Sequence, residues 1–144
     1  MTPYSQFPPP SPDSPEGTSA LLRVKDLLVA IAESTGAVVF SKDRDGRYTF
    51  VNQACVDLWG LPRDEIVGKT DHELFPPETA RRILEADRRV IASGEAVVLE
   101  EEVVFQGRRH VFNSSKVPLT DGRGEVYALC GVATEITEQR LAHE

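Results

Sequence analysis

Cysteine is scarce in this 144-residue chain, and positive charge is not in excess. The two cysteines, Cys55 and Cys130, lie far apart without the spacing of a zinc site or a disulfide framework, so we expect free thiols and no metal. The formal net charge of −7 gives no electrostatic basis for binding nucleic acid or an anionic membrane. No apolar run approaches the roughly 20 residues that a membrane span needs. We expect a cytoplasmic chain without nucleic-acid or membrane partners.

Prolines gather at the N-terminus, where six of them stand among serines in residues 1–17. Such a segment has too few apolar residues to form a core, which predicts a disordered, extended leader. From Ser19 onward, apolar residues recur with helical spacing, which predicts an amphipathic helix within a flanking segment at 18–36. Ser19 is its predicted N-cap and Gly36 its end. The apolar stripe of this helix includes Leu21, Val24, Leu28 and Ile31.

Turn and cap signals divide residues 37–137 into a domain of strands and helices. The run Asp43–Gly46 predicts a tight hairpin. It also resembles the start of a calcium loop, but no glutamate stands at the closing position. Asn52 is the predicted N-cap of a short helix that ends on Trp59, a predicted core residue, and Thr70 begins a second helix with a capping box. Glycine turns later in the chain predict an antiparallel meander of three strands.

One acidic residue interrupts the apolar stripe of the longest predicted helix, which runs from Pro76 to Gly94. Asp87 falls between Ile83 and Val90, on the side that must face the core. An unpaired carboxylate in that position would cost several kcal/mol. Asp87 therefore needs either a basic partner or a bound ligand.

Three stretches of the chain follow one another in a recognisable order: DRDGRYTFVNQA, LWGLPRDEIVGKTDHELFP and KVPLTDGRGEVYALCGVATEITEQR. In that order they resemble the PAS family of sensory domains, over residues 25–140. The resemblance is to the PAS domains of bacterial sensor histidine kinases and diguanylate cyclases in particular. It implies an α+β PAS fold: a five-stranded antiparallel sheet with helices on one face, plus the N-terminal amphipathic helix as a flanking element.

The same resemblance implies a sensory or signal-relay domain without catalysis of its own. A small-molecule pocket would lie between the long helix and the sheet. In a longer parent, an effector such as a histidine kinase or a diguanylate cyclase would follow, as in two-component systems. The family's closing Asp-Ile-Thr stands here as Glu135, Ile136 and Thr137, the expected signal exit, and residues 138–144 would start an exit helix. The resemblance also implies a homodimer, with Leu21, Val24, Leu28 and Ile31 as the expected interface.

The residues do not favour the coloured cofactors of the family. Haem-binding members resemble one another in placing an axial histidine on the long helix, and residues 77–93 contain none; His72 stands earlier, in the capping box. The light-oxygen-voltage subfamily has a cysteine where this chain has Asp71, so a flavin adduct is not expected. We expect no cofactor, neither haem nor flavin.

Aligning the Gln106-Gly107 turn and Pro118 with the family predicts which strand residues face the pocket. The inward set would be Glu100, Glu102, Phe112, Ser114 and Lys116. The outward set would be Val97, Leu99, Val103, Phe105, Val111 and Val117. An outer face this apolar must be covered, by the helix at 19–33 or by a second subunit. The final strand is apolar on both faces, which favours the same covering.

The predicted site therefore combines acids and a base around Asp87. Its expected ligand-binding residues are Asp87, Glu102, Phe112, Ser114, Lys116, Ile83, Val90 and Tyr127, with His110 near enough to join. Two interpretations stay open. In one, Lys116 neutralises the carboxylates in a buried ion-pair network, and the domain is a ligand-free dimerisation module. In the other, the same charges bind a small polar metabolite, with Lys116 on its carboxylate and an acid on its amine or hydroxyl.

Overall fold

The computed structural model describes residues 13–137, which form two units divided between Ser34 and Thr35. The first unit contains helix α1 (Pro15–Ser34). Ser14 is its N-cap, because the Ser14 side-chain oxygen accepts a hydrogen bond from the backbone N–H of Gly17 at 2.8 Å. The helix thus begins before the predicted cap at Ser19, and residues 15–17 are helical rather than extended.

The apolar face of α1 is open to solvent. Its large side chains are each between 52% and 60% exposed, namely Leu21, Leu22, Val24, Leu27, Leu28 and Ile31. The predicted dimer interface lies on this face and stays a prediction. Residues 1–12 of the expected leader and the exit helix expected at 138–144 lie outside the described residues. No helix within residues 13–137 is both long enough and apolar enough to cross a membrane.

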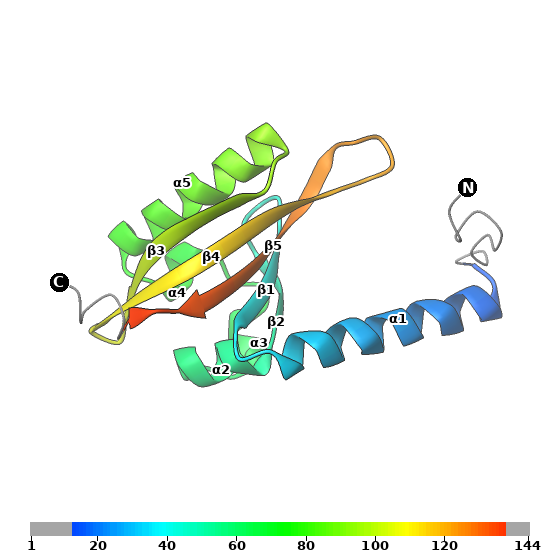
Figure 1. The fold of residues 1–144 in the computed structure, drawn as a ribbon, viewed down its shortest axis with the longest axis horizontal. Helices are drawn as coiled ribbons and strands as arrows, with labels where there is room; N and C mark the ends of the chain where they lie inside the picture. Colours follow the sequence, from blue (N-terminus) through cyan, green and yellow to red (C-terminus); the bar gives the residue numbers. More distant parts are fainter. Residues whose placement is uncertain (1–12, 138–144) are drawn as a thin grey trace. The chain divides into compact units, whose positions relative to one another are not determined.

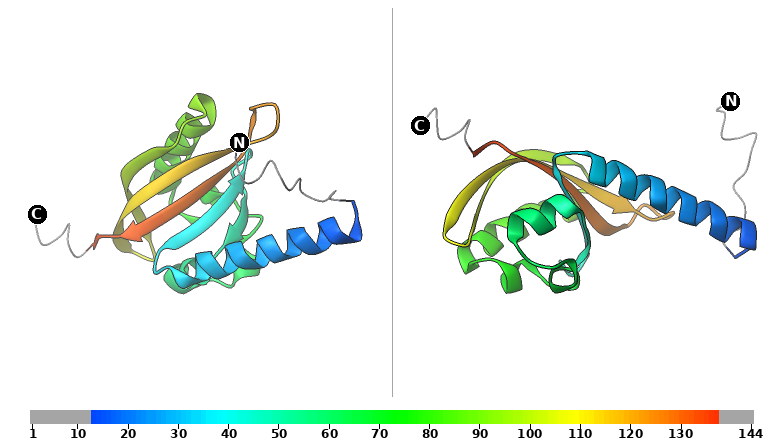
Figure 2. Two further views of the ribbon diagram at one scale, coloured as in Figure 1. Left: turned by 45° about the vertical axis from the view of Figure 1, so that its right-hand side comes forward. Right: turned by 90° about the horizontal axis from the view of Figure 1, so that it is seen from below.

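The second unit is built on a five-stranded sheet with the strand order β2-β1-β5-β4-β3, antiparallel throughout (Figure 1). Its strands are β1 (Val38–Asp43), β2 (Tyr48–Val51), β3 (Val97–Phe105), β4 (Arg108–Thr120) and β5 (Val126–Glu135). Its helices are α2 (Gln53–Trp59), α3 (Arg63–Ile66), α4 (Asp71–Leu74) and α5 (Pro77–Ser93). All four helices cover the same face of the curved sheet (Figure 2), which confirms the predicted α+β architecture.

Local hydrogen bonds close the first turn and the first short helix of this unit as the sequence predicts. The Asp43 carboxylate accepts hydrogen bonds from the backbone N–H groups of Asp45 and Arg47, at 2.9 and 3.0 Å, so this run forms a hairpin turn. The side-chain oxygen of Asn52 accepts the backbone N–H of Cys55 at 3.2 Å and caps α2. These contacts hold β1, β2 and α2 in their relative positions.

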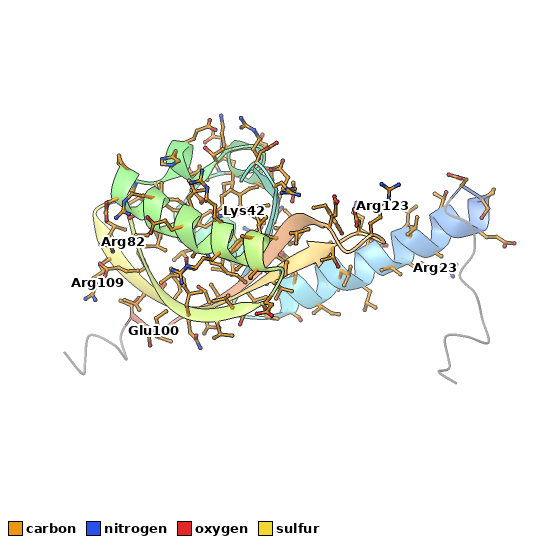
Figure 3. All side chains as sticks on the ribbon, turned by 90° about the horizontal axis from the view of Figure 1, so that it is seen from above. Arg23, Lys42, Arg82, Glu100, Arg109 and Arg123 are labelled. Carbon is orange, nitrogen blue, oxygen red and sulfur yellow. The ribbon has the colours of Figure 1, made fainter. Side chains whose placement is uncertain are left out.

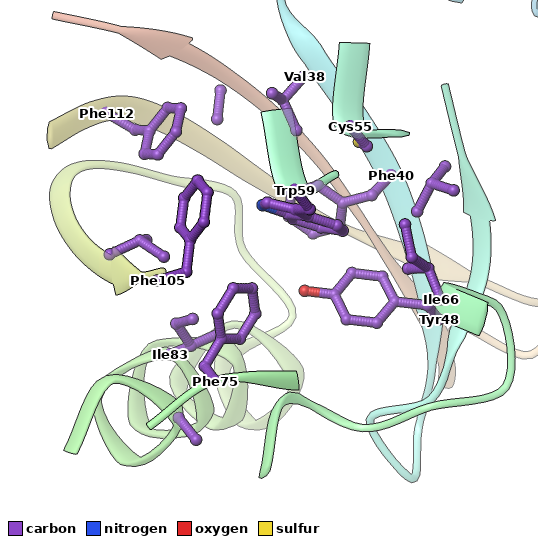
Figure 4. Packing of buried hydrophobic residues seen from close by; sticks show 14 of the residues in the cluster. Val38, Phe40, Tyr48, Cys55, Trp59, Ile66, Phe75, Ile83, Phe105 and Phe112 are labelled. Atoms are coloured by element: carbon purple, nitrogen blue, oxygen red, sulfur yellow. The ribbon is translucent and has the colours of Figure 1, made fainter. Parts of the chain in front are cut away.

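An aromatic series fills the space between the sheet and the helices (Figure 4). Phe40, Tyr48, Trp59 and Phe75 meet edge to face in sequence, with ring centroids 5.5 to 5.7 Å apart. Phe105 continues the series, with its centroid 6.4 Å from that of Phe75. Such pairs contribute about 0.5–1.5 kcal/mol each beyond the burial of their area. Trp59 is therefore a core residue, as predicted.

The inner face of β4 agrees with the sequence prediction. Phe112, Ser114 and Lys116 are 5%, 2% and 1% exposed, respectively. The ammonium of Lys116 reaches Asp87 on α5, which shows that this set of side chains points toward the helices.

The inner face of β3 does not agree with the prediction. The two-residue turn pairs Phe105 with Arg108, so every odd-numbered residue of β3 stands opposite an even-numbered residue of β4. Directly opposite residues share a face of the sheet. The inward set is therefore Val97, Leu99, Glu101, Val103 and Phe105, and the prediction that Glu100 and Glu102 point inward was wrong.

Candidate functional site

Lys42 lies at the centre of a group of buried charges, although it is a lysine with only 1% of its surface exposed. It stands on β1 two residues after Phe40, on the inner face of the sheet. Its Nζ donates a hydrogen bond to Asp71 Oδ2 at 2.6 Å and another to Asp87 Oδ2 at 2.8 Å. Asp71 comes from α4 and Asp87 from α5, so this one side chain connects the sheet to two helices. Figure 3 labels Lys42 beside α5.

Lys116 extends the group toward β3. Its Nζ donates to Asp87 Oδ1 at 2.7 Å and lies 2.8 Å from Glu101 Oε2. At the other end, the hydroxyl of Tyr48 donates to Asp71 Oδ1 at 2.6 Å. We call these six residues the buried charge network: Lys42, Tyr48, Asp71, Asp87, Glu101 and Lys116. With its carboxylates ionised, the network sets two ammonium groups against three carboxylates, which leaves one surplus negative charge.

The surroundings of Asp87, Lys42 and Tyr48 shift the pKa of each of these three groups. Burial alone would raise the pKa of the Asp87 carboxyl, but the charges and hydrogen bonds of Lys42 and Lys116 lower it below the ordinary 3.8. Burial alone would lower the pKa of the Lys42 ammonium, but the two aspartates raise it above the ordinary 10.5. Burial and the charge of Asp71 raise the pKa of Tyr48 well above its ordinary value, so its hydroxyl stays a donor.

A cavity of about 40 Å³ adjoins the network, with room for about three water molecules. Five aromatic side chains line it, namely Phe40, Tyr48, Trp59, Phe75 and Phe112. Its polar lining comes from Lys42, Glu101, Ser114 and Lys116. Among the described residues, the buried Oγ of Ser114 has no hydrogen-bond partner. Buried polar atoms without a partner are rare, so an occupant of the cavity is expected to supply one.

The structure brings most of the predicted site residues together. Ile83, Phe112, Ser114 and Lys116 line the cavity. Asp87 accepts a hydrogen bond from Lys116 and lines a second hollow, of about 290 Å³, instead. Val90 is fully buried on the same helix, in the core rather than in the cavity wall. Whether any of these residues binds a ligand stays a prediction.

Three of the expected positions were wrong. Glu102 is directed away from Lys116, and its carboxylate lies 3.1 Å from the guanidinium of Arg109. Tyr127 is 53% exposed, next to an irregularity where β5 pairs with the end of β4. His110 is on the inner face but does not join the network. Its ring stacks on that of Phe105 with centroids 4.2 Å apart.

Sequence reasoning missed four members of the network: Lys42, Tyr48, Asp71 and Glu101. A signal for Lys42 is present, because Val38, Phe40 and Lys42 alternate along β1 and so share one face. Asp71 was considered only as the position of a missing flavin cysteine and as part of the capping box. Glu101 was not considered, because the predicted register turned its neighbours Glu100 and Glu102 inward.

The exit residues are tied to the start of β4. Glu135 carries a carboxylate whose two oxygens are each 3.3 Å from His110 Nδ1. The Thr137 hydroxyl accepts the backbone N–H of Val111 at 2.9 Å, and the Ile136 N–H donates to the Val111 carbonyl at 2.8 Å. The longer acid found here in place of the family's aspartate therefore contacts a histidine that itself packs on the aromatic core.

The described part of the chain offers little for a metal. Cys55 and Cys130 are free thiols. Within residues 13–137 no three His, Cys, Asp or Glu side chains are grouped closely enough to hold a metal ion.

The fold and the interior site define the class of this protein: the chain belongs to the PAS fold family, which it matches over residues 32–141. Among solved structures, the PAS domain of BvgS from Bordetella pertussis has a TM-score of 0.65 and is 24% identical; the match covers 84% of this chain and 95% of that one.

Two relatives indicate the kinds of protein in which such a domain stands. The methanogenesis regulatory histidine kinase FilI of Methanothrix harundinacea is 38% identical over 113 residues, which are 78% of this chain and 13% of that protein. A diguanylate cyclase of Vibrio cholerae is 32% identical over 111 residues, 75% of this chain and 35% of the cyclase. Relatives of these kinds identify the chain as a sensory signalling domain. It spans only a minor part of each of these two relatives.

Proposed function

We propose that this PAS domain is a sensory relay, in which a change in the interior cavity passes along β4 to the exit segment (Glu135, Ile136 and Thr137). One observation carries the proposal: a single strand holds both ends of the path. Ser114 and Lys116 of β4 line the cavity, and Val111, farther back on the same strand, makes one hydrogen bond to Ile136 and one to Thr137.

His110 provides a second connection along the same path. Its ring packs between the core and the exit, stacked on Phe105 and hydrogen bonded to Glu135. A shift of the aromatic wall would therefore move the exit carboxylate as well as the backbone. We further propose that the exit leads to an effector, a histidine kinase or a diguanylate cyclase, in a longer parent protein. The relatives support this proposal, because both kinds of effector occur among them.

The relay is tested by changing the cavity and observing the exit. Ser114→Val replaces the cavity hydroxyl with two methyl groups, and Ser115→Val makes the same change one residue away, on the outer face. We expect amide NMR shifts of Val111, Ile136 and Thr137 in the first variant and much smaller ones in the second. Equal shifts of the exit amides in both variants would contradict the relay.

Native mass spectrometry tests whether the cavity is occupied in the purified protein. The protein is weighed folded and then denatured, beside an absorbance scan. A reproducible extra mass that is lost on denaturation would support a bound ligand and give its mass. Absorption above the protein band would instead reveal a coloured cofactor. A bare chain mass would favour the second candidate function.

The second candidate is a ligand-free dimerisation module. The buried charge network favours it, because Lys42 and Lys116 each already have two carboxylate partners inside the protein. The open apolar face of α1 favours it too, since a second copy of the chain would cover that face. In this case the network is a structural device, and substitutions in the cavity change only stability.

A further inference from the structure

The charges of the interior site do not suit an anion. Lys42 is bound by Asp71 and Asp87, and Lys116 by Asp87 and Glu101, so no ammonium in the network lacks a carboxylate partner. A ligand carboxylate or phosphate would have to displace one of these acids. The surplus of one negative charge favours the opposite ligand charge, because a buried charge without a counter-charge is costly.

The aromatic lining of the cavity also favours a cation over an anion. Five aromatic side chains line it, and the faces of aromatic rings attract cations. The ammonium of Lys42 already uses this property, since its Nζ lies 4.7 Å from the centroid of the Tyr48 ring and 5.4 Å from that of Phe40. A ligand ammonium in the cavity would meet rings of the same kind.

The Ser114 hydroxyl indicates where the ligand would be held. It is 2% exposed, lines the cavity and has no partner among the described residues. Ser114 pairs with Leu99 across the sheet and Glu101 with Phe112, so Glu101 is the diagonal neighbour of Ser114 on the same face. An N–H donor between the two side chains would satisfy the hydroxyl oxygen and lie close to the carboxylate.

We propose that this cavity binds a small primary ammonium compound, with Ser114 Oγ accepting one of its N–H groups and Glu101 supplying the counter-charge. The inference rests on the proposed sensory function and names the ligand class of its site. The volume of about 40 Å³ limits the enclosed part of the ligand to about three non-hydrogen atoms. For so few atoms the dissociation constant is no tighter than about 1 mM.

Three probes of nearly equal size and different charge test this assignment: ethylammonium, ethanol and acetate. Each is added to the 144-residue protein at matched ionic strength while the amide NMR shifts of Phe112, Ser114 and Lys116 are followed. Tetramethylammonium serves as a cation that is too large and has no N–H group, and potassium chloride as an inorganic cation. We expect saturable shifts with ethylammonium alone.

Two variants assign the binding to the named groups. Glu101→Gln removes the surplus charge and keeps an oxygen that accepts from Lys116, and Ser114→Ala removes the hydroxyl. Each is expected to weaken ethylammonium binding at least tenfold. Glu100→Gln, with the same change on the exposed outer face, is the matched control and is expected to bind as the parent does. A urea midpoint for each variant establishes that it is folded.

Several results would overturn the assignment: acetate or ethanol binding as tightly as ethylammonium, an equal effect of potassium, or no saturable shift with any probe. A full response in Glu101→Gln would do the same. The relay is judged separately, from the Ile136 and Thr137 amides. If ethylammonium binds and these amides do not move, the ligand class stands and the relay fails. If ethanol or acetate binds and moves them, the relay stands and the ligand class fails.

Discussion

At the scale of single residues, the packing of the Phe40 ring against β5 depends on Gly131. A Cβ atom at this position would lie 2.2 Å from Cζ of Phe40, which is far inside van der Waals contact. Gly131 is buried on the inner face, directly opposite Phe40 in the β1–β5 pairing. The ring of Phe40 therefore occupies the space that any other residue would need, and it starts the aromatic series of the core.

We expect Gly131→Ala to destabilise the domain by about 1–3 kcal/mol, the usual cost of overpacking a core. Urea unfolding measures the change. Gly122→Ala is the control, because a Cβ there would meet nothing within 4 Å and is expected to change stability by less than about 0.5 kcal/mol. If both variants unfold at the same urea concentration, the packing of Phe40 is not as tight as described here.

Asp87 links the two lysines of the buried charge network, since it accepts a hydrogen bond from each. Asp87→Asn leaves both ammonium groups with one carboxylate fewer, and we expect a loss of about 3–5 kcal/mol at neutral pH. Glu85→Gln on the exposed side of α5 removes a charge from a surface ion pair and is expected to cost at most about 1 kcal/mol. Equal losses would mean that the network is not buried in solution.

Asp87 also makes the stability of the domain depend on pH, and the sign of this dependence follows from the pKa of Asp87. The folded pKa of Asp87 lies below the ordinary 3.8, so the unfolded chain binds the proton more readily. The contribution of the Asp87 carboxylate to stability is present above pH 3.8 and is lost as the pH falls through the pKa of Asp87 in the folded state. Urea midpoints between neutral and strongly acidic pH should therefore fall more steeply for the parent than for Asp87→Asn. Parallel curves would contradict the lowered pKa.

At the scale of helices and strands, what could be predicted depended on how local the signal was. Asn52 and Gly60 bound α2, and Gly94 ends α5, because caps act within a few residues. The buried side of α5, with Asp87 on it, followed from helical periodicity. The face of β3 depended on pairing with β4, and the even-to-even assignment of Glu102 and Lys116 is incompatible with a two-residue turn.

The partners of Asp87 could be predicted only in part, for a related reason. Lys116 was found because β4 was aligned as a strand with one inner face. Lys42 stands on β1, which was considered only as half of a hairpin, and it meets Asp87 across 45 residues of sequence. Contacts over such separations depend on the order of strands in the sheet, which no short pattern in this chain contains. The cavity has the same dependence, since its lining comes from all five strands and from three helices or their ends.

Helix α1 leads to a prediction about association. Leu28 is 60% exposed in the middle of its apolar face. If a second copy covers this face, Leu28→Glu places a carboxylate in the interface and is expected to convert a dimer into a monomer at micromolar concentration. Ala30→Glu adds the same charge 200° farther around the helix and is expected to leave the dimer intact. Sedimentation of both variants makes the comparison, and a parent that is monomeric at that concentration would contradict the dimer.

At the scale of the whole molecule, two sets of polar contacts between distant elements bear on the relay. The buried charge network joins β1, β2, β3 and β4 to α4 and α5. The exit segment is joined to β4 by Thr137, Ile136 and Glu135. The first connection is buried and the second is partly exposed to solvent. We therefore expect the exit to open without unfolding of the sheet, which a relay requires.

Thr137→Val tests this separation of the exit from the core. The variant keeps the shape of the side chain but loses the oxygen that accepts the Val111 N–H. A lost hydrogen bond of about 1 kcal/mol corresponds to roughly fivefold faster opening, so hydrogen exchange of the Val111 and Ile136 amides should accelerate by about that factor. Exchange of the buried Leu129 amide should not change, because β5 stays paired on both sides. Thr134 is an exposed threonine on β5, and Thr134→Val is expected to change the exchange of neither the exit amides nor Leu129. If Leu129 accelerates together with Ile136 in Thr137→Val, the exit and the sheet open as one unit, and the exit segment could not carry a signal that leaves the core intact.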